Sequence, residues 1–243
     1  MSNLLMMIAV SLSSSLIAQI LSSWEISRIR RKEGVPSDPV LIRFLDLSII
    51  FLTSMLIQVC LYYEQREIMA LGGLFGAFLA ASAWSDAKTG WVPDVSIAPA
   101  FVLGFMLTWF SYSSSEPSLM SGMWASLTAL MIFGAIVLSY LNFSFMRITP
   151  PDLIFVLMIV FTPSGLPQMM IVLITLFLCV ILVKLFPDVI RSMIPDNERK
   201  RLTDQMEEVI GYEKGYMENH GWFPLGPIAL ICILVGYCAN AAI

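Results

Sequence analysis

The sequence predicts an all-α, polytopic membrane protein with about eight transmembrane helices, forming a single domain over residues 1–243. Hydrophobic residues make up 58% of the chain and charged residues only 13%, whereas soluble domains average about 45–50% apolar and about 25% charged residues. Apolar runs long enough to cross a bilayer recur along the chain, and basic residues gather between them on one side. This composition excludes a water-soluble globule, a disordered chain and a nucleic-acid binder with a basic surface.

The predicted crossings are apolar runs of about 20 residues, the length that a bilayer core about 30 Å thick requires. In chain order they cover residues 3–23, 41–63, 67–85, 95–112, 121–142, 152–162, 167–187 and 224–242. The first is rich in serine and contains Gln19, so we expect it to pack against other helices. It has no basic start and no clear small-residue cleavage site, which predicts a retained helix rather than a signal peptide.

Turn and charge signals set several of the other boundaries. The third run ends at Asp86, the fourth begins after Pro93 and the last opens at Pro224. The sixth run is short, and the turn-forming stretch 162–167 follows it. We therefore expect a short or tilted crossing whose ends are shielded by neighbouring helices.

The basic residues predict the orientation of the chain. With the N-terminus outside, the inner loops are 24–40, 86–94, 143–151 and 188–223, and of the 14 Lys and Arg residues only Arg66 lies on the outer side. Because basic loops resist translocation, this asymmetry supports eight crossings, including the short sixth one. Within 188–223, an apolar stripe at helical spacing predicts an interfacial amphipathic helix on the cytoplasmic surface; its members are Leu202, Met206, Val209 and Ile210.

Four aspartates near the predicted membrane boundary are candidates for function, because ionisable groups at membrane depth are costly. For Asp46 we favour a structural role, satisfied by polar neighbours or by Arg43. For Asp94 we favour capping of the helix that it begins. Each of the other two also has an ordinary interpretation, Asp86 as a solvated helix-end acid paired with Lys88 and Asp152 as a helix cap after two prolines.

Considered together, Asp86 and Asp152 have a chemical interpretation. The predicted topology places both at the same depth on the cytoplasmic face, and two carboxylates brought close can share a proton, since both do not ionise easily. One can then activate water while the other, protonated, polarises a scissile carbonyl. The hypothesis is an aspartic peptidase dyad of Asp86 and Asp152, which requires no metal and no organic cofactor.

The run Asp86-Ala87-Lys88-Thr89-Gly90-Trp91-Val92-Pro93-Asp94 resembles the first aspartate motif of the type IV prepilin peptidases, and Phe223-Pro224-Leu225-Gly226-Pro227 resembles the closing segment of that family. The resemblance covers most of residues 67–243. It implies an aspartic endopeptidase of the inner (cytoplasmic) membrane that cleaves short basic leaders from prepilin-like substrates on the cytoplasmic side. Such enzymes serve type IV pili and protein secretion.

Two features depart from the family pattern. The family places its second catalytic aspartate in Gly-x-Gly-Asp, whereas this chain has Thr149-Pro150-Pro151-Asp152. The paired C-x-x-C motifs of the methyltransferase insert are also missing, so the resemblance implies peptidase activity alone. The four cysteines, Cys60, Cys179, Cys232 and Cys238, all lie in apolar runs, which indicates neither a zinc site nor a disulfide framework.

Three alternatives remain open at this stage. A catalytically inactive assembly or scaffold protein of the same architecture would explain Pro150-Pro151. An intramembrane protease of the presenilin or signal-peptide-peptidase kind would need Gly-x-Gly-Asp and a Pro-Ala-Leu motif, and the chain has neither. A small transporter predicts inverted halves or charges near the membrane centre, and the sequence shows neither pattern.

Overall fold

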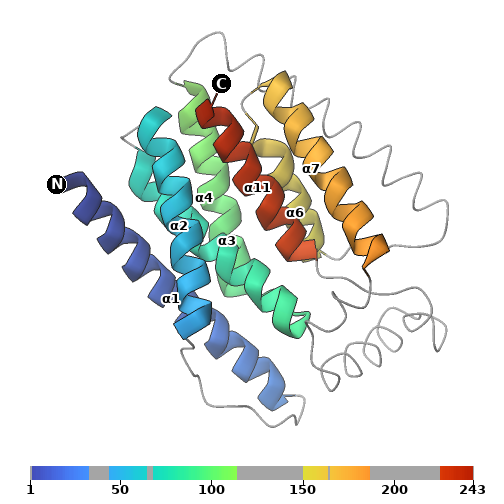
Figure 1. The fold of residues 1–243 in the computed structure, drawn as a ribbon. Helices are drawn as coiled ribbons and strands as arrows, with labels where there is room; N and C mark the ends of the chain where they lie inside the picture. Colours follow the sequence, from blue (N-terminus) through green and yellow to red (C-terminus); the bar gives the residue numbers. More distant parts are fainter. Residues whose placement is uncertain are drawn as a thin grey trace.

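The computed structural model describes residues 2–32, 44–64, 68–113, 150–163, 165–186 and 225–242, and these contain seven α-helices and no β-strand (Figure 1). The predicted all-α class is therefore confirmed for this part of the chain. The predicted fifth crossing at 121–142 and the predicted interfacial helix within 188–223 lie outside the described residues. The helices are α1 (Ser2–Lys32), α2 (Phe44–Glu64), α3 (Met69–Thr89), α4 (Asp94–Ser113), α6 (Pro150–Phe161), α7 (Leu166–Leu185) and α11 (Leu225–Ala242).

Each described helix overlaps one predicted crossing, and the largest difference in length is in α1. That helix continues to Lys32, beyond the predicted end at residue 23. The extension contains no Gly or Pro, and the next residue of either kind is Gly34. Because nothing in the extension breaks a helix, the end of the apolar run is not the end of the helix.

Three of the described helices are long and apolar enough to cross a membrane: Asn3–Arg31, Phe44–Tyr62 and Leu225–Ala242. Two shorter apolar helical stretches, Asp94–Thr108 and Pro167–Val183, accompany them. On α7, the large side chains of Ile174, Phe177 and Leu182 are more than half exposed, as expected of a face that lies against lipid rather than water. The chain is thus a helical membrane protein.

Helix α3 lies at the centre of the bundle, where it packs against α1, α2, α4 and α11 (Figure 1). Its small residues permit this close packing. A Cβ added at Gly76 would lie 2.9 Å from the Cα of Ser54 in α2, and one added at Gly72 would lie 2.3 Å from the Leu61 side chain. The core is completed by buried Phe75 and Leu79 from the same helix.

The ends of the helices meet in two groups, and this sets the direction of each helix. At one end, called the Asp86 end below, the last turn of α3 meets the first turns of α4 and α11. At the other end, called the Thr162 end, Thr108 of α4 donates a hydrogen bond to the carbonyl of Phe161 (3.2 Å) and Asn240 of α11 donates one to the carbonyl of Thr162 (2.9 Å). Since α4, α6 and α11 all finish there, α6 also begins at the Asp86 end.

Candidate functional site

Asp86 lies in the last turn of α3 and is buried, with 5% of its surface exposed. Its Oδ2 atom accepts a 2.7 Å hydrogen bond from the main-chain N–H of Gly226, the second residue of α11. The first N–H groups of a helix have no partner inside the helix, and the positive end of the helix dipole favours a carboxylate there. The interpretation of Asp86 as a solvated helix-end acid is therefore wrong.

Gly226 is the residue that lets α11 come this close to Asp86. A Cβ at this position would lie 2.8 Å from the Cα of Ala83 and 2.9 Å from Oδ2 of Asp86. Because the first of these neighbours is main chain, it cannot move aside as a flexible side chain could. The first segment that resembles a prepilin peptidase motif, 86–94, thus meets the described part of the second, 225–227, at Gly226. A larger residue at this position would not fit the contact.

The Gly and Pro of the first motif form the turn between α3 and α4. Gly90 has a φ of 66°, the left-handed conformation typical of a residue that ends a helix, and its N–H donates a 2.8 Å hydrogen bond to the carbonyl of Asp86. The carbonyl of Pro93 then accepts the first hydrogen bonds of α4, from the N–H groups of Ser96 and Ile97. The main chain of Asp86 is therefore fixed by the turn, and its side chain by α11.

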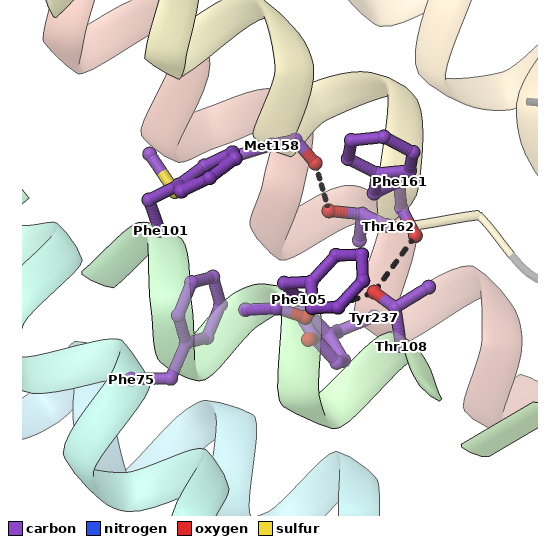
Figure 2. A pocket seen from close by; sticks show the side chains of 9 residues that line it. Phe75, Phe101, Phe105, Thr108, Met158, Phe161, Thr162 and Tyr237 are labelled. Carbon is purple, nitrogen blue, oxygen red and sulfur yellow. Dashed lines mark hydrogen bonds between the residues drawn. The ribbon is translucent and has the colours of Figure 1, made fainter. Parts of the chain in front are cut away.

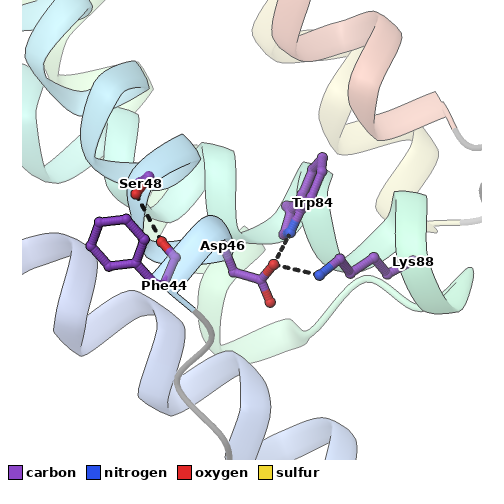
Figure 3. Close-up of polar contacts among 5 residues, drawn as sticks. All are labelled: Phe44, Asp46, Ser48, Trp84 and Lys88. Carbon is purple, nitrogen blue, oxygen red and sulfur yellow. Dashed lines mark hydrogen bonds and ion pairs between the residues drawn. The ribbon is translucent and has the colours of Figure 1, made fainter.

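Lys88 forms an ion pair with Asp46 of α2, and Trp84 donates a 2.9 Å hydrogen bond from Nε1 to the same Oδ1 atom (Figure 3). Residues two apart on a helix point in different directions, which explains why Lys88 reaches across to α2 instead of pairing with Asp86 as expected. Asp46 has polar neighbours, as predicted, whereas Arg43 lies outside the described residues. The basic residue of the motif therefore connects α3 to α2.

Asp94 is the first residue of α4 and is exposed. The carboxylate that binds the start of this helix is that of Glu25 in α1, whose Oε2 accepts a 2.9 Å hydrogen bond from the N–H of Val95. The prediction that Asp94 caps α4 is therefore wrong. The cap is Glu25, which was not identified from the sequence. No local pattern could have revealed it, because the acid and the N–H group are 70 positions apart.

Asp152 is the third residue of α6, the helix that begins at the Asp86 end of the bundle. At about 1.5 Å per residue, α6 rises about 15 Å between Asp152 and Thr162, and α11 rises about 21 Å between Gly226 and Asn240. Since Asn240 contacts Thr162, the main chain of Asp152 is offset from that of Gly226 by about one helical turn along the bundle. The side chain of Asp152 lies outside the described residues.

Pro150 and Pro151 are the first two residues of α6. Proline is well suited to this position, since its ring presets φ for a helix and the N–H that it lacks would have no partner in the first turn. The two prolines that distinguish this chain from the Gly-x-Gly-Asp pattern therefore begin α6, and Asp152 follows them directly.

A second polar cluster, not predicted as a site, joins α1, α2 and α3 inside the bundle. Ser54 donates to the carbonyl of Gly73 at 2.7 Å and lies 2.9 Å from the hydroxyl of Ser11, which also accepts a 3.0 Å hydrogen bond from Nε2 of Gln58. All of these side chains are buried. A Cβ at Gly73 would lie 1.8 Å from Nε2 of Gln58. The cluster confirms that the serine-rich first helix packs against other helices.

A small cavity lies between α4, α6 and α11 near the Thr162 end, away from Asp86 (Figure 2). Its volume of about 10 Å³ is roughly what one water molecule needs, so it cannot accept a peptide. Among the described residues, no group of three or more His, Cys, Asp or Glu side chains could hold a metal ion. The cavity is lined by Phe75, Phe101, Gly104, Phe105, Thr108, Met158, Phe161, Thr162 and Tyr237.

The comparisons with known proteins add no relative to this picture. No family model, no curated protein and no solved structure matches the chain. The family resemblance therefore depends on the motifs at 86–94 and 223–227, which the fold brings together at Asp86 and Gly226.

Proposed function

We propose that the protein is a membrane aspartic endopeptidase of the prepilin peptidase kind, with Asp86 and Asp152 as its catalytic residues. One observation carries the proposal: Asp86 is buried and held on the first turn of α11, at the end of the bundle where α6 begins with Asp152 two residues inside it. A dyad requires that both residues lie at the same end of the bundle, and the main chains of Asp86 and Asp152 meet that requirement.

The proposed reaction is the hydrolysis of one peptide bond. One carboxylate takes a proton from a water molecule as the water oxygen attacks the carbonyl carbon, and the other carboxyl group donates a proton to the carbonyl oxygen. The tetrahedral intermediate then releases the amine, which takes up a proton from the dyad.

The proposed substrate is a prepilin-like protein, in which a short basic leader precedes an apolar helix. With eight crossings and the N-terminus outside, the Asp86 end faces the cytoplasm in the inner membrane. The apolar helix of such a substrate would lie in the bilayer beside the bundle. The bond between leader and helix would then stand at the membrane surface, at the depth of Asp86.

The test is leader removal from a co-expressed prepilin, followed as a mobility shift and by mass spectrometry of the new N-terminus. Asp86→Asn and Asp152→Asn should each abolish processing, while Asp94→Asn serves as a matched control because Asp94 belongs to the same motif and is exposed. Protein levels and detergent-extracted size profiles of all three variants should equal those of the parent. Processing at the parental rate by either of the first two variants would refute the dyad.

A scaffold protein of the same architecture is the second candidate, and the Asp86–Gly226 hydrogen bond favours it too. A carboxylate that holds a helix N-terminus has a structural use without any turnover. Asparagine retains an oxygen that can accept the Gly226 N–H. A scaffold should therefore tolerate Asp86→Asn and Asp152→Asn in an assembly assay, whereas an enzyme should not.

A further inference from the structure

The four cysteines of the chain face one another in two pairs, and each pair includes one residue of α11. The sulfur atoms of Cys60 in α2 and Cys238 in α11 are 3.7 Å apart. The side chains of Cys179 in α7 and Cys232 in α11 interact with each other. No local pattern predicts this pairing, because Cys60 and Cys238 are 178 positions apart.

The two pairs differ in access. Cys60 and Cys238 each lie about one turn before the end of their helices, at the Thr162 end, and Cys238 is exposed. Cys232 is 0% exposed and lies about 9 Å further from the end of α11, at about 1.5 Å per residue. A reagent at the membrane surface can therefore reach Cys238 but not Cys232.

We propose that Cys60 and Cys238 are a disulfide-forming site that joins α2 to α11. A disulfide requires sulfur atoms about 2.05 Å apart, so the observed pair needs only to approach by less than 2 Å. With the predicted orientation, the Thr162 end faces the outside, where disulfides form and persist.

The oxidant is a protein or small-molecule disulfide, and the exchange takes two steps. The thiolate of Cys238 attacks one sulfur of the donor disulfide, which forms a mixed disulfide and releases one donor thiolate. The thiolate of Cys60 then attacks the Cys238 sulfur and releases the second donor thiolate. The two cysteines lose two electrons and two protons in all, and the donor gains them as a dithiol.

The experiment uses the full chain, purified in detergent and exposed to oxidised glutathione. The protein is then denatured, remaining thiols are blocked with N-ethylmaleimide, and the digested protein is examined by mass spectrometry. The expected result is a linked peptide that joins Cys60 to Cys238, with two thiols lost and with Cys179 and Cys232 blocked. The link should disappear when the protein is denatured before oxidation at high dilution, since the fold holds the two sulfur atoms together.

Matched variants identify the pair. Cys60→Ala and Cys238→Ala should each abolish the linked peptide, whereas Cys179→Ala and Cys232→Ala should leave it unchanged. Four reactive thiols after oxidation of the parent, a link between other cysteines, or a dimer joined through two copies of Cys238 would each overturn the proposal. None of these readouts uses peptidase activity, so the result is independent of the proposed function.

Discussion

The main-chain N–H of Gly226 donates a 2.7 Å hydrogen bond to Oδ2 of Asp86, across 140 positions of the sequence. The contact joins the central helix of the bundle to the start of α11. It holds the Asp86 carboxyl group in one orientation, because Oδ2 accepts this hydrogen bond. Asp86 therefore has a structural role that is separate from the proposed chemistry.

Asp86→Asn and Asp86→Ala should differ in stability although both should lack processing. Asparagine keeps an oxygen that accepts the Gly226 N–H, so we expect its unfolding temperature to stay near that of the parent. Alanine removes the acceptor and should cost about 1–2 kcal/mol, the usual range for the loss of a helix N-terminal cap. Thermal unfolding in detergent measures the difference. Equal unfolding temperatures for the two variants would show that the hydrogen bond contributes nothing.

Gly226→Ala should reduce both stability and processing, because its Cβ would lie 2.8 Å from the main chain of Ala83. We expect a loss of about 1–3 kcal/mol, as for other overpacked positions. Gly236→Ala is the matched control on the same helix, since its Cβ would meet side-chain atoms of Thr162 at 2.7 Å, far from Asp86. Processing per folded molecule should fall only in Gly226→Ala, and an equal fall in both variants would contradict the positioning of Asp86 by α11.

Glu25→Ala should destabilise the protein by about 1 kcal/mol, because it removes the acceptor for the N–H of Val95. Glu25→Gln keeps an oxygen and should cost less. Asp94→Ala should change the unfolding temperature little, since Asp94 is exposed. If Asp94→Ala were the more harmful of the two alanine variants, Asp94 would be the functional cap of α4 after all.

The Lys88–Asp46 ion pair should contribute little to catalysis and modestly to stability. The Lys88 side chain is 32% exposed and that of Asp46 is 15% exposed, so solvent screens their attraction. A double-mutant cycle with Lys88→Met and Asp46→Asn should give a coupling free energy of about 1 kcal/mol or less. The Lys88→Met variant should still process substrate. Complete loss of processing in a folded Lys88→Met variant would show that Lys88 is required for catalysis.

Local sequence signals predicted the helices better than the contacts between them. Apolar runs and turn residues located the seven described helices, because hydrophobicity and helix breaking are properties of short segments. They could not show that α1 continues to Lys32, since polar residues remain helical when no breaker intervenes. Three contacts between helices were not predicted: Glu25 with Val95, Lys88 with Asp46, and Asp86 with Gly226. Each of these contacts depends on which helices become neighbours, and that is decided by packing over the whole bundle.

The Asp86–Gly226 contact also has a consequence for biosynthesis. Ribosomes add about 5–20 residues per second, so about 7–28 s pass between the synthesis of the two partners, which are 140 positions apart. During this interval the Asp86 carboxyl group lacks the N–H group of Gly226 that later binds it. Asp86 therefore gains its hydrogen bond to Gly226 only after α11 has been synthesised and has joined the bundle.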